Sequence, residues 1–231
     1  MKSKSSDARV LRGAEASILA LLLVAVVVIG VNTYMSRSAL ESERGAPTVN
    51  IPPVDQGEHI VGELEAPVHL IVYTNFDCPF CKDFHERTIP YLQAIFGAEI
   101  AIIYRHFPLP RFPNSHLEAA ASECVAQLAG EDAFWVFAAT LFASHRPEGR
   151  DSAELTAIAR NMGVPERQFA ACLEEGEAYE SVAEDRTRAL AAGISITPSV
   201  VIRKGNTTVL VEGNWYGRMR TAIEQLLQRS P

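Results

Sequence analysis

Residues 76–81, Phe-Asp-Cys-Pro-Phe-Cys, lie between a segment with the composition of a buried strand and a segment with helical periodicity. The preceding run, Val68–Tyr73, is rich in β-branched and aromatic residues, which favours a strand. The following run, residues 82–96, carries apolar residues at helical spacing. Cys78 should therefore lie at a helix N-terminus, where unpaired backbone N–H groups and the helix dipole stabilise an anion. We expect Cys78 to form a stable thiolate.

Two cysteines separated by two residues fit three kinds of site: half of a zinc site, a fixed disulfide, or a redox pair that cycles between dithiol and disulfide. Zinc needs about four ligands, and the sequence has no second Cys-x-x-Cys and no paired histidine cluster. His85 follows Cys81 closely, but a fourth ligand would still be missing. We therefore favour redox chemistry at Cys78 and Cys81, and we expect no metal and no cofactor.

The composition excludes one class of function. The chain has 231 residues, of which 48% are hydrophobic, so one domain with a substantial core and some appended segments is expected. The formal net charge is -7, and no basic patch is present to bind phosphates. A nucleic-acid partner is therefore not expected.

The N-terminal part contains an almost wholly apolar stretch, residues 16–35, which is long enough to cross a bilayer. Basic residues precede it: Lys2, Lys4, Arg9 and Arg12. By the positive-inside rule, residues 1–15 are cytoplasmic and everything after the stretch is outside. A cleavable signal peptide is the alternative, but Ser36–Ala39 offers no clean small-x-small site. We expect an uncleaved, single-pass anchor in the cell membrane and a periplasmic or otherwise extracytoplasmic domain.

This topology places all four cysteines in an oxidising compartment, where disulfides form and persist. Residues 36–57, which are polar and then rich in Pro and Gly, are expected to be a tether. Residues 58–231 are expected to form the folded domain.

The predicted elements of that domain alternate in a recognisable order. We expect strands at 68–75 and 99–105 with a helix at 79–96 between them, and this βαβ unit requires parallel strands. A block of helices follows at about 114–192. Strands at 198–203 and 207–212 and a helix at 216–228 complete the chain. Without the helical block, this order resembles the thioredoxin arrangement, so the predicted fold class is α/β with an inserted helical domain.

Five separated segments together resemble the DsbA-like branch of the thioredoxin superfamily. They are residues 75–81 at the active-site turn, 104–109 at the end of the second strand, 119–124 with Phe134 and Trp135 in the inserted helices, 169–173 in a later helix, and 193–199 in the loop that carries a cis-proline. The resemblance covers about residues 58–228. It implies a thioredoxin fold with an inserted helical domain and the activity of a protein thiol–disulfide oxidoreductase.

The resemblance also implies roles for the active-site turn. Cys78 would be the exposed nucleophile that enters mixed disulfides, and Cys81, one turn further in, would resolve them. Pro79 and Phe80 would tune the thiolate.

Two further pairs take their roles from the same resemblance. Thr197–Pro198 would be a cis bond beside the active-site pair, where its backbone binds an extended substrate segment. Some members of the family bridge the positions of Cys124 and Cys172 as a structural disulfide. A disulfide between them would close a loop of 48 residues and would stabilise the fold by about 4 kcal/mol. Two buried thiols are the alternative.

The sequence departs from the family at one position. Many relatives carry an acidic residue six positions before the first active-site cysteine, where it can move protons for the second, but this chain has Val72. Asp77 is acidic but adjoins Cys78, so we expect it to act as a like charge that disfavours the thiolate. His85, His106 and His116 are expected to be surface or packing residues. The sequence therefore predicts neither the route by which Cys81 exchanges its proton nor the redox potential of the pair.

The functional hypothesis is a membrane-tethered oxidase that donates the disulfide of Cys78 and Cys81 to exported proteins with free thiols and is reoxidised by a membrane redox partner. A reductase or isomerase is the alternative within enzymes. Isomerases of this kind usually need a dimerising module, and the short tether offers none. A tethered holdase is the alternative from another class, but such a binder would need neither thiol.

Overall fold

The computed structural model describes residues 25–33, 49–55 and 57–228. Among these residues, no helix combines the length and the apolar character needed to span a membrane. Residues 25–33 are helical and exposed. The predicted cytoplasmic segment, residues 1–15, and the rest of the predicted anchor lie outside the described residues, as does most of the predicted tether.

A mixed five-stranded sheet forms the centre of the described domain, with the strand order β1-β3-β2-β4-β5. β2 and β3 are parallel, as the βαβ prediction requires, and the other neighbours are antiparallel. The strands are β1 (His59–Val61), β2 (Val68–Thr74), β3 (Ile100–His106), β4 (Ser199–Lys204) and β5 (Thr207–Glu212).

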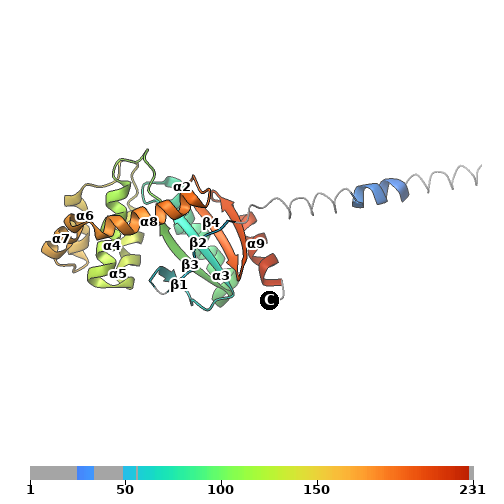
Figure 1. The fold of residues 1–231 in the computed structure, drawn as a ribbon, viewed down its shortest axis with the longest axis horizontal. Coiled ribbons are helices and arrows are strands. Elements are labelled where there is room, and N and C mark those ends of the chain that lie inside the picture. Colours follow the sequence, from blue (N-terminus) through green and yellow to red (C-terminus); the bar gives the residue numbers. More distant parts are fainter. Residues whose placement is uncertain (1–24, 34–48, 56, 229–231) are drawn as a thin grey trace, which may run out of the picture. The chain divides into compact units, whose positions relative to one another are not determined.

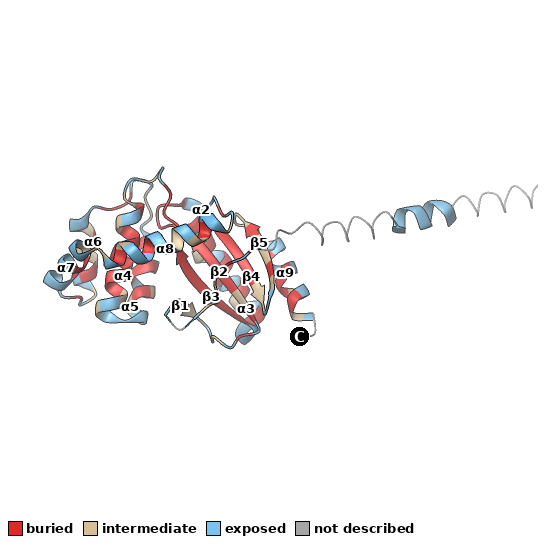
Figure 2. Cartoon of the chain, viewed as in Figure 1, coloured by how far each residue is buried: buried red, intermediate tan, exposed pale blue. Residues whose placement is uncertain are grey.

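Both faces of the sheet are covered, because its central strands carry apolar residues on both sides. Leu70 and Val72 of β2 pack on one face against α3 (Ile89–Phe96) and α9 (Tyr216–Gln228). Ile71 and Tyr73 point to the other face, which is covered by the end of α8 (Glu177–Ala191) and the segment at residues 49–51. The central strands are therefore almost wholly buried (Figure 2).

The helical insertion comes between β3 and β4 along the chain, and its helices α4 to α7 lie beside the sheet (Figure 1). An apolar core lies within it. It comprises α4 (Ser115–Ala129), α5 (Glu131–Ala143), α6 (Ser152–Asn161), α7 (Glu166–Glu175) and α8. The insertion thus occupies residues 115–191. Its core also includes Cys78 and Cys81, so the insertion packs directly against the active-site turn.

The helix predicted at 79–96 is divided into three pieces. α2 (Pro79–Asp83) is followed by a π-helical turn (Phe84–Thr88) and then by α3. Pro90, in the first turn of α3, explains the widened turn, because it cannot donate a backbone hydrogen bond and its ring crowds the preceding turn. A short 3-10 turn (Gly97–Glu99) then leads into β3.

The end of the predicted tether is part of the folded domain. Val49 and Ile51 are buried. The Arg203 guanidinium donates hydrogen bonds to the carbonyl oxygens of Ile51 and Pro52, at 3.1 and 3.0 Å. The tether was predicted from its content of polar residues, Pro and Gly. That prediction did not take into account the alternating apolar residues at positions 49 and 51.

Candidate active site

The two active-site cysteines lie where β2 leads into α2. Cys78 directly precedes the helix and has an extended backbone, with φ -91° and ψ 118°. Pro79 opens the helix, where a missing N–H costs no hydrogen bond. The N–H of Cys81 donates to the Cys78 carbonyl oxygen at 3.0 Å, which places Cys81 one turn further in.

Cys78 is buried, which differs from the expected exposure. Its relative exposure is 0%, whereas Phe80, two residues later, is 65% exposed. The loop before β4 covers the thiol, because the Thr197 carbonyl oxygen lies 3.5 Å from the Cys78 Sγ. The Thr197–Pro198 bond in this loop is cis, as the resemblance implied. The resemblance placed this loop beside the active-site pair, but it did not indicate that the loop would bury Cys78.

The surroundings of Cys78 favour its thiolate. A hydrogen bond from the Cys81 thiol is the largest influence that lowers the pKa of Cys78, and burial opposes it. The Thr197 side chain and the backbone N–H groups of Cys81 and Phe80 lower it further, to about 6. Most of Cys78 is therefore ionised near neutral pH, so it can act as a nucleophile.

The pKa of Cys81 is shifted in the opposite direction, upward. Complete burial raises its pKa well above the ordinary value, and the hydrogen bond to Cys78 and the charge there raise it further. A hydrogen bond with the Thr74 side chain offsets only part of this shift. Cys81 is thus held as a protonated thiol while Cys78 is a thiolate.

Val72 is in the apolar core, so it offers no proton route to Cys81. A different set of polar atoms approaches this thiol. The Thr74 hydroxyl interacts with Cys81, and the His85 Nε2 lies 3.2 Å from the same Thr74 oxygen. Burial lowers the pKa of His85 to about 3, so its ring is neutral at physiological pH. His85 stacks on Phe142, with ring centroids 4.2 Å apart, which fits the packing role predicted for it.

Asp77 is also buried, and this changes its expected effect on Cys78. Burial is the main cause that raises the pKa of Asp77 to about 8, and Glu118 adds to it through a hydrogen bond and its charge. Both Asp77 oxygens and the Glu118 Oε2 lack a partner unless one carboxyl carries a proton. Asp77 is therefore neutral at physiological pH. The predicted repulsion between Asp77 and the Cys78 thiolate is present, because the Cys78 charge is among the causes that raise the pKa of Asp77, and the proton on the carboxyl relieves it.

The groups that enclose Asp77 come from the helical insertion and its loops. The Arg150 guanidinium donates to the Glu118 carboxylate at 2.6 Å, and both side chains are almost inaccessible. Gly149, with φ +68°, packs so closely that a Cβ there would lie 2.9 Å from an Asp77 oxygen. The His145 Nε2 lies 3.0 Å from the Asp77 carbonyl oxygen. The insertion thus fixes the residue that precedes the nucleophile.

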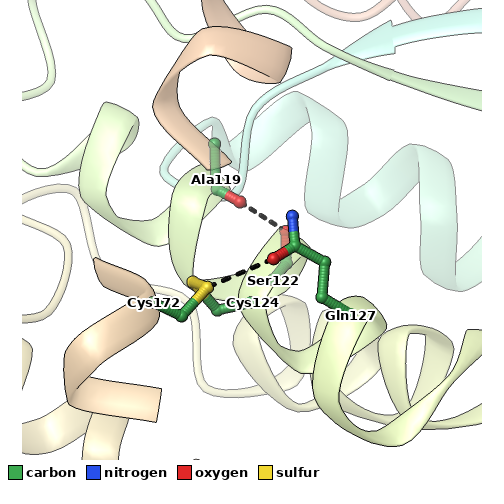
Figure 3. The surroundings of a disulfide bond; sticks show 5 residues. All are labelled: Ala119, Ser122, Cys124, Gln127 and Cys172. Atoms are coloured by element: carbon green, nitrogen blue, oxygen red, sulfur yellow. Dashed lines mark hydrogen bonds between the residues drawn. A yellow bond between two sulfur atoms is a disulfide. The ribbon is translucent and has the colours of Figure 1, made fainter. Parts of the chain in front are cut away.

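Cys124 and Cys172 form a disulfide that joins α4 to α7, with an S–S distance of 2.03 Å (Figure 3). The Gln127 side-chain oxygen lies 3.4 Å from the Cys172 Sγ, and the Ser122 hydroxyl donates to the Ala119 carbonyl oxygen one turn away. This pairing agrees with the structural role implied by the resemblance. It leaves Cys78 and Cys81 as the two reduced cysteines.

Sequence reasoning missed several residues of this site. Thr74 and His85 were not connected to Cys81, and Glu118 and Arg150 were not connected to Asp77. A polar residue at the end of a buried strand, such as Thr74, was the one available signal. The Glu118–Arg150 pair joins a helix to a distant loop, and no sequence spacing indicates it.

Comparison with protein families agrees with this geometry. A family model described as Thioredoxin matches residues 55–224, which is most of the chain. The match includes the active-site turn, the helical insertion and the loop with the cis bond. The family match and the fold support the predicted enzyme class, a protein thiol–disulfide oxidoreductase.

Solved structures with the same architecture include DsbA-type proteins. BdbD from Bacillus subtilis, in its oxidised form, has a TM-score of 0.66 at 22% identity and covers 79% of this chain and 99% of its own. Pseudomonas aeruginosa DsbA2 has a TM-score of 0.62 at 23% identity and covers 74% of this chain and 93% of its own. At these identities the similarity establishes the fold.

A curated relative is much longer than this chain. The Na(+)/H(+) antiporter NhaA of Herminiimonas arsenicoxydans is 28% identical over 190 residues, which are 82% of this chain and 29% of the antiporter. The chain therefore spans less than a third of that relative. The match is to a minor part of the antiporter, so ion transport is not carried over.

Proposed function

Because the chain belongs to the thioredoxin family, we propose that it is a DsbA-like oxidase that donates the disulfide of Cys78 and Cys81 to exported proteins with free thiols. Residues 16–35 anchor it in the cell membrane as a single-pass helix, with residues 1–15 in the cytoplasm and the folded domain on the extracytoplasmic side. A membrane redox partner reoxidises it. The long apolar run and the basic residues before it support this topology.

The oxidase proposal rests on one observation: the pKa values of the two thiols are shifted in opposite directions. The pKa of Cys78 is lowered to about 6, whereas that of Cys81 is raised. A stabilised thiolate lowers the free energy of the reduced protein, so the disulfide becomes a stronger oxidant. The same shift makes Cys78 a good leaving group when a substrate thiolate displaces it.

The proposed reaction consists of two thiol–disulfide exchanges. A substrate thiolate attacks the Cys78 Sγ, the Cys78–Cys81 bond breaks, and Cys81 leaves and takes up a proton. A second thiolate of the substrate then attacks the substrate sulfur that is bonded to Cys78 in the mixed disulfide, and Cys78 leaves as a thiolate. The substrate loses two electrons and gains a disulfide, while the enzyme gains two electrons and becomes the dithiol. The membrane redox partner accepts these electrons.

Exposed apolar residues beside the pair support a protein substrate. Phe80 is 65% exposed and Ile196, directly before Thr197, is 41% exposed. Phe80 follows Cys78 by two positions, and Ile196 directly precedes Thr197, whose carbonyl oxygen lies 3.5 Å from the Cys78 Sγ. A segment of a chain that has not yet folded would offer apolar side chains for such contacts. Because Cys78 is covered, the loop at residues 194–198 has to shift when a substrate sulfur approaches.

The redox potential measured against glutathione tests the direction of electron flow. We expect a value near the DsbA end of the range, about -120 mV, and a value near thioredoxin's, about -270 mV, would instead support a reductase. Cys78→Ser should abolish the catalysed oxidation of a reduced test protein. A holdase would keep its effect on substrate solubility in this variant, and unchanged oxidation would contradict the mechanism.

A further inference from the structure

Two histidines and a glutamate converge where the edge of the sheet meets the helical insertion. His59 begins β1, His106 ends β3, and Glu123 lies within α4. The Nε2 atoms of His106 and His59 lie 2.9 and 3.1 Å from one atom, the Glu123 Oε1. Each residue offers one atom that can bind a metal, and these three atoms all lie within 4.8 Å of one another. Three donors from three separate segments therefore face one point.

The spacing of these atoms fits a small cation. Zinc binds histidine nitrogen and carboxylate oxygen at about 2.0–2.2 Å, so tetrahedral ligand atoms lie roughly 3.3 Å apart. The two observed nitrogen-to-oxygen distances are a few tenths of an ångström shorter than this. A small outward shift of the three side chains would admit the ion. The side chains are only 12%, 1% and 13% exposed, so they are already ordered by packing.

The second ring nitrogen of His59 has the partner that a metal-binding histidine usually has. Its Nδ1 lies 2.8 Å from the Glu131 Oε2. Without an ion, both nitrogens of His59 would have to donate to carboxylates. With an ion at Nε2, the Nδ1–H donates to Glu131, which is the outer carboxylate that typically orients a metal-bound imidazole. The ring also stacks on Phe134, with centroids 3.5 Å apart.

A polar cavity of about 400 Å³ borders the cluster and gives access to it. Its lining includes His59, Tyr104 and Glu123, together with Glu58 and Asp185. The Tyr104 hydroxyl is buried and has no partner. Unpaired buried polar atoms beside a cavity are typical places for ordered water. The lining carries five carboxyl groups and one guanidinium, that of Arg188, so the cavity is acidic on balance, and water in it could complete the coordination.

We propose that His59, His106 and Glu123 bind a first-row divalent transition metal ion, with zinc as the ion to test. Two imidazoles and one carboxylate suit such an ion. Calcium and magnesium prefer ligand sets made of oxygen alone. The expectation of no metal considered only Cys78 and Cys81 as the start of a zinc site, and His106 was expected to pack or to lie at the surface. A bound ion would link β1 and β3 to α4 and stabilise that junction.

The experiment uses the full chain in detergent with Cys78→Ser and Cys81→Ser, so that the active-site thiols cannot bind zinc. After treatment with a chelator, zinc chloride is titrated by calorimetry, and the thermal unfolding midpoint is measured with and without zinc. We expect one zinc per chain and a higher midpoint with zinc. His59→Gln or Glu123→Gln should abolish both effects, and Glu131→Gln should weaken binding by about 10–100-fold. His116→Gln, on the exposed side of α4, is the matched control and should bind zinc like its parent.

Two results would overturn the proposal. One is the absence of saturable zinc binding in the parent, and the other is binding that survives His59→Gln and Glu123→Gln. Because His106 is almost fully buried, its variant could fail to fold, so the two more accessible ligands decide the outcome. Calcium titration adds a further check, since calcium should not compete with zinc. None of these readouts depends on redox activity, so their failure is distinguishable from failure of the oxidase proposal.

Discussion

The Thr197 carbonyl oxygen lies 3.5 Å from the Cys78 Sγ, although the two residues are 119 positions apart in the chain. The loop before β4 thus closes over a thiol at the start of α2. The Thr197 Oγ1 is buried and has no other hydrogen-bond partner. A hydrogen bond from the Thr197 side chain is one of the causes of the lowered pKa of Cys78. The Thr197 side chain therefore favours the thiolate form of the nucleophile.

Replacing this hydroxyl should shift the thiolate equilibrium. In Thr197→Val, we expect the pKa of Cys78 to rise from about 6 and the redox potential to become more negative, because the reduced form loses a hydrogen bond to its charge. Thiolate absorbance followed against pH measures the first effect. Thr197→Ser should retain most of the wild-type behaviour, and Thr187→Val, on the exposed face of α8, is the control. A pKa of Cys78 that is the same in Thr197→Val and the wild type would exclude this role.

The buried carboxyl of Asp77 should give stability a distinctive pH dependence. Its folded pKa, about 8, exceeds the unfolded value of about 3.9. The folded state thus keeps a proton that the unfolded state releases between these pH values, so the free energy of unfolding falls as pH rises through that window. Asp77→Asn should remove this contribution to the dependence of the unfolding free energy on pH. Urea unfolding at several pH values measures it, with Asp132→Asn at an exposed site of α5 as the control. An identical slope in Asp77→Asn and the wild type would contradict the assignment.

The fold was predictable because its signals are local. Val68–Tyr73 is apolar on both faces, as a central strand requires, and the helices of the insertion have separate start and stop residues. β1 was missed because its three residues are too few to show alternation. The π-helical turn before Pro90 was missed because apolar spacing alone does not distinguish a widened turn from a regular one.

The site was predictable only where a motif marks it. Cys78 and Cys81 stand out at any strand-to-helix junction, but their pKa values depend on groups that only the tertiary fold brings near them. Burial decides that Asp77 is neutral, and Glu118 reaches it from the helical insertion. A negative charge beside the nucleophile was the natural expectation, because sequence does not report how far a carboxyl is removed from water.

The disulfide between Cys124 and Cys172 should contribute to stability without contributing to catalysis. Cys124→Ser with Cys172→Ser should lower the free energy of unfolding by about 2–4 kcal/mol, because the unfolded chain gains the freedom that the crosslink removes. Oxidation of a reduced test protein should continue at the wild-type rate below the unfolding temperature. Urea unfolding of oxidised proteins gives the stability change. A loss of catalysis in the fully folded variant would mean that this disulfide also takes part in electron transfer.

The contact between His85 and Thr74 leads to the last prediction, which concerns the proton of Cys81. Val72 supplies no acid, whereas the Thr74 hydroxyl interacts with Cys81 and lies 3.2 Å from the His85 Nε2. If protons leave Cys81 by this route, His85→Leu and Thr74→Val should each slow the attack of Cys81 on a mixed disulfide between Cys78 and glutathione. The double variant should be no slower than the slower single variant, because the two residues would act in one path. Stopped-flow rates over a range of pH provide the measurement, with His116→Leu as the control. Strictly additive effects on the activation free energy would indicate separate packing roles, since His85 also stacks on Phe142.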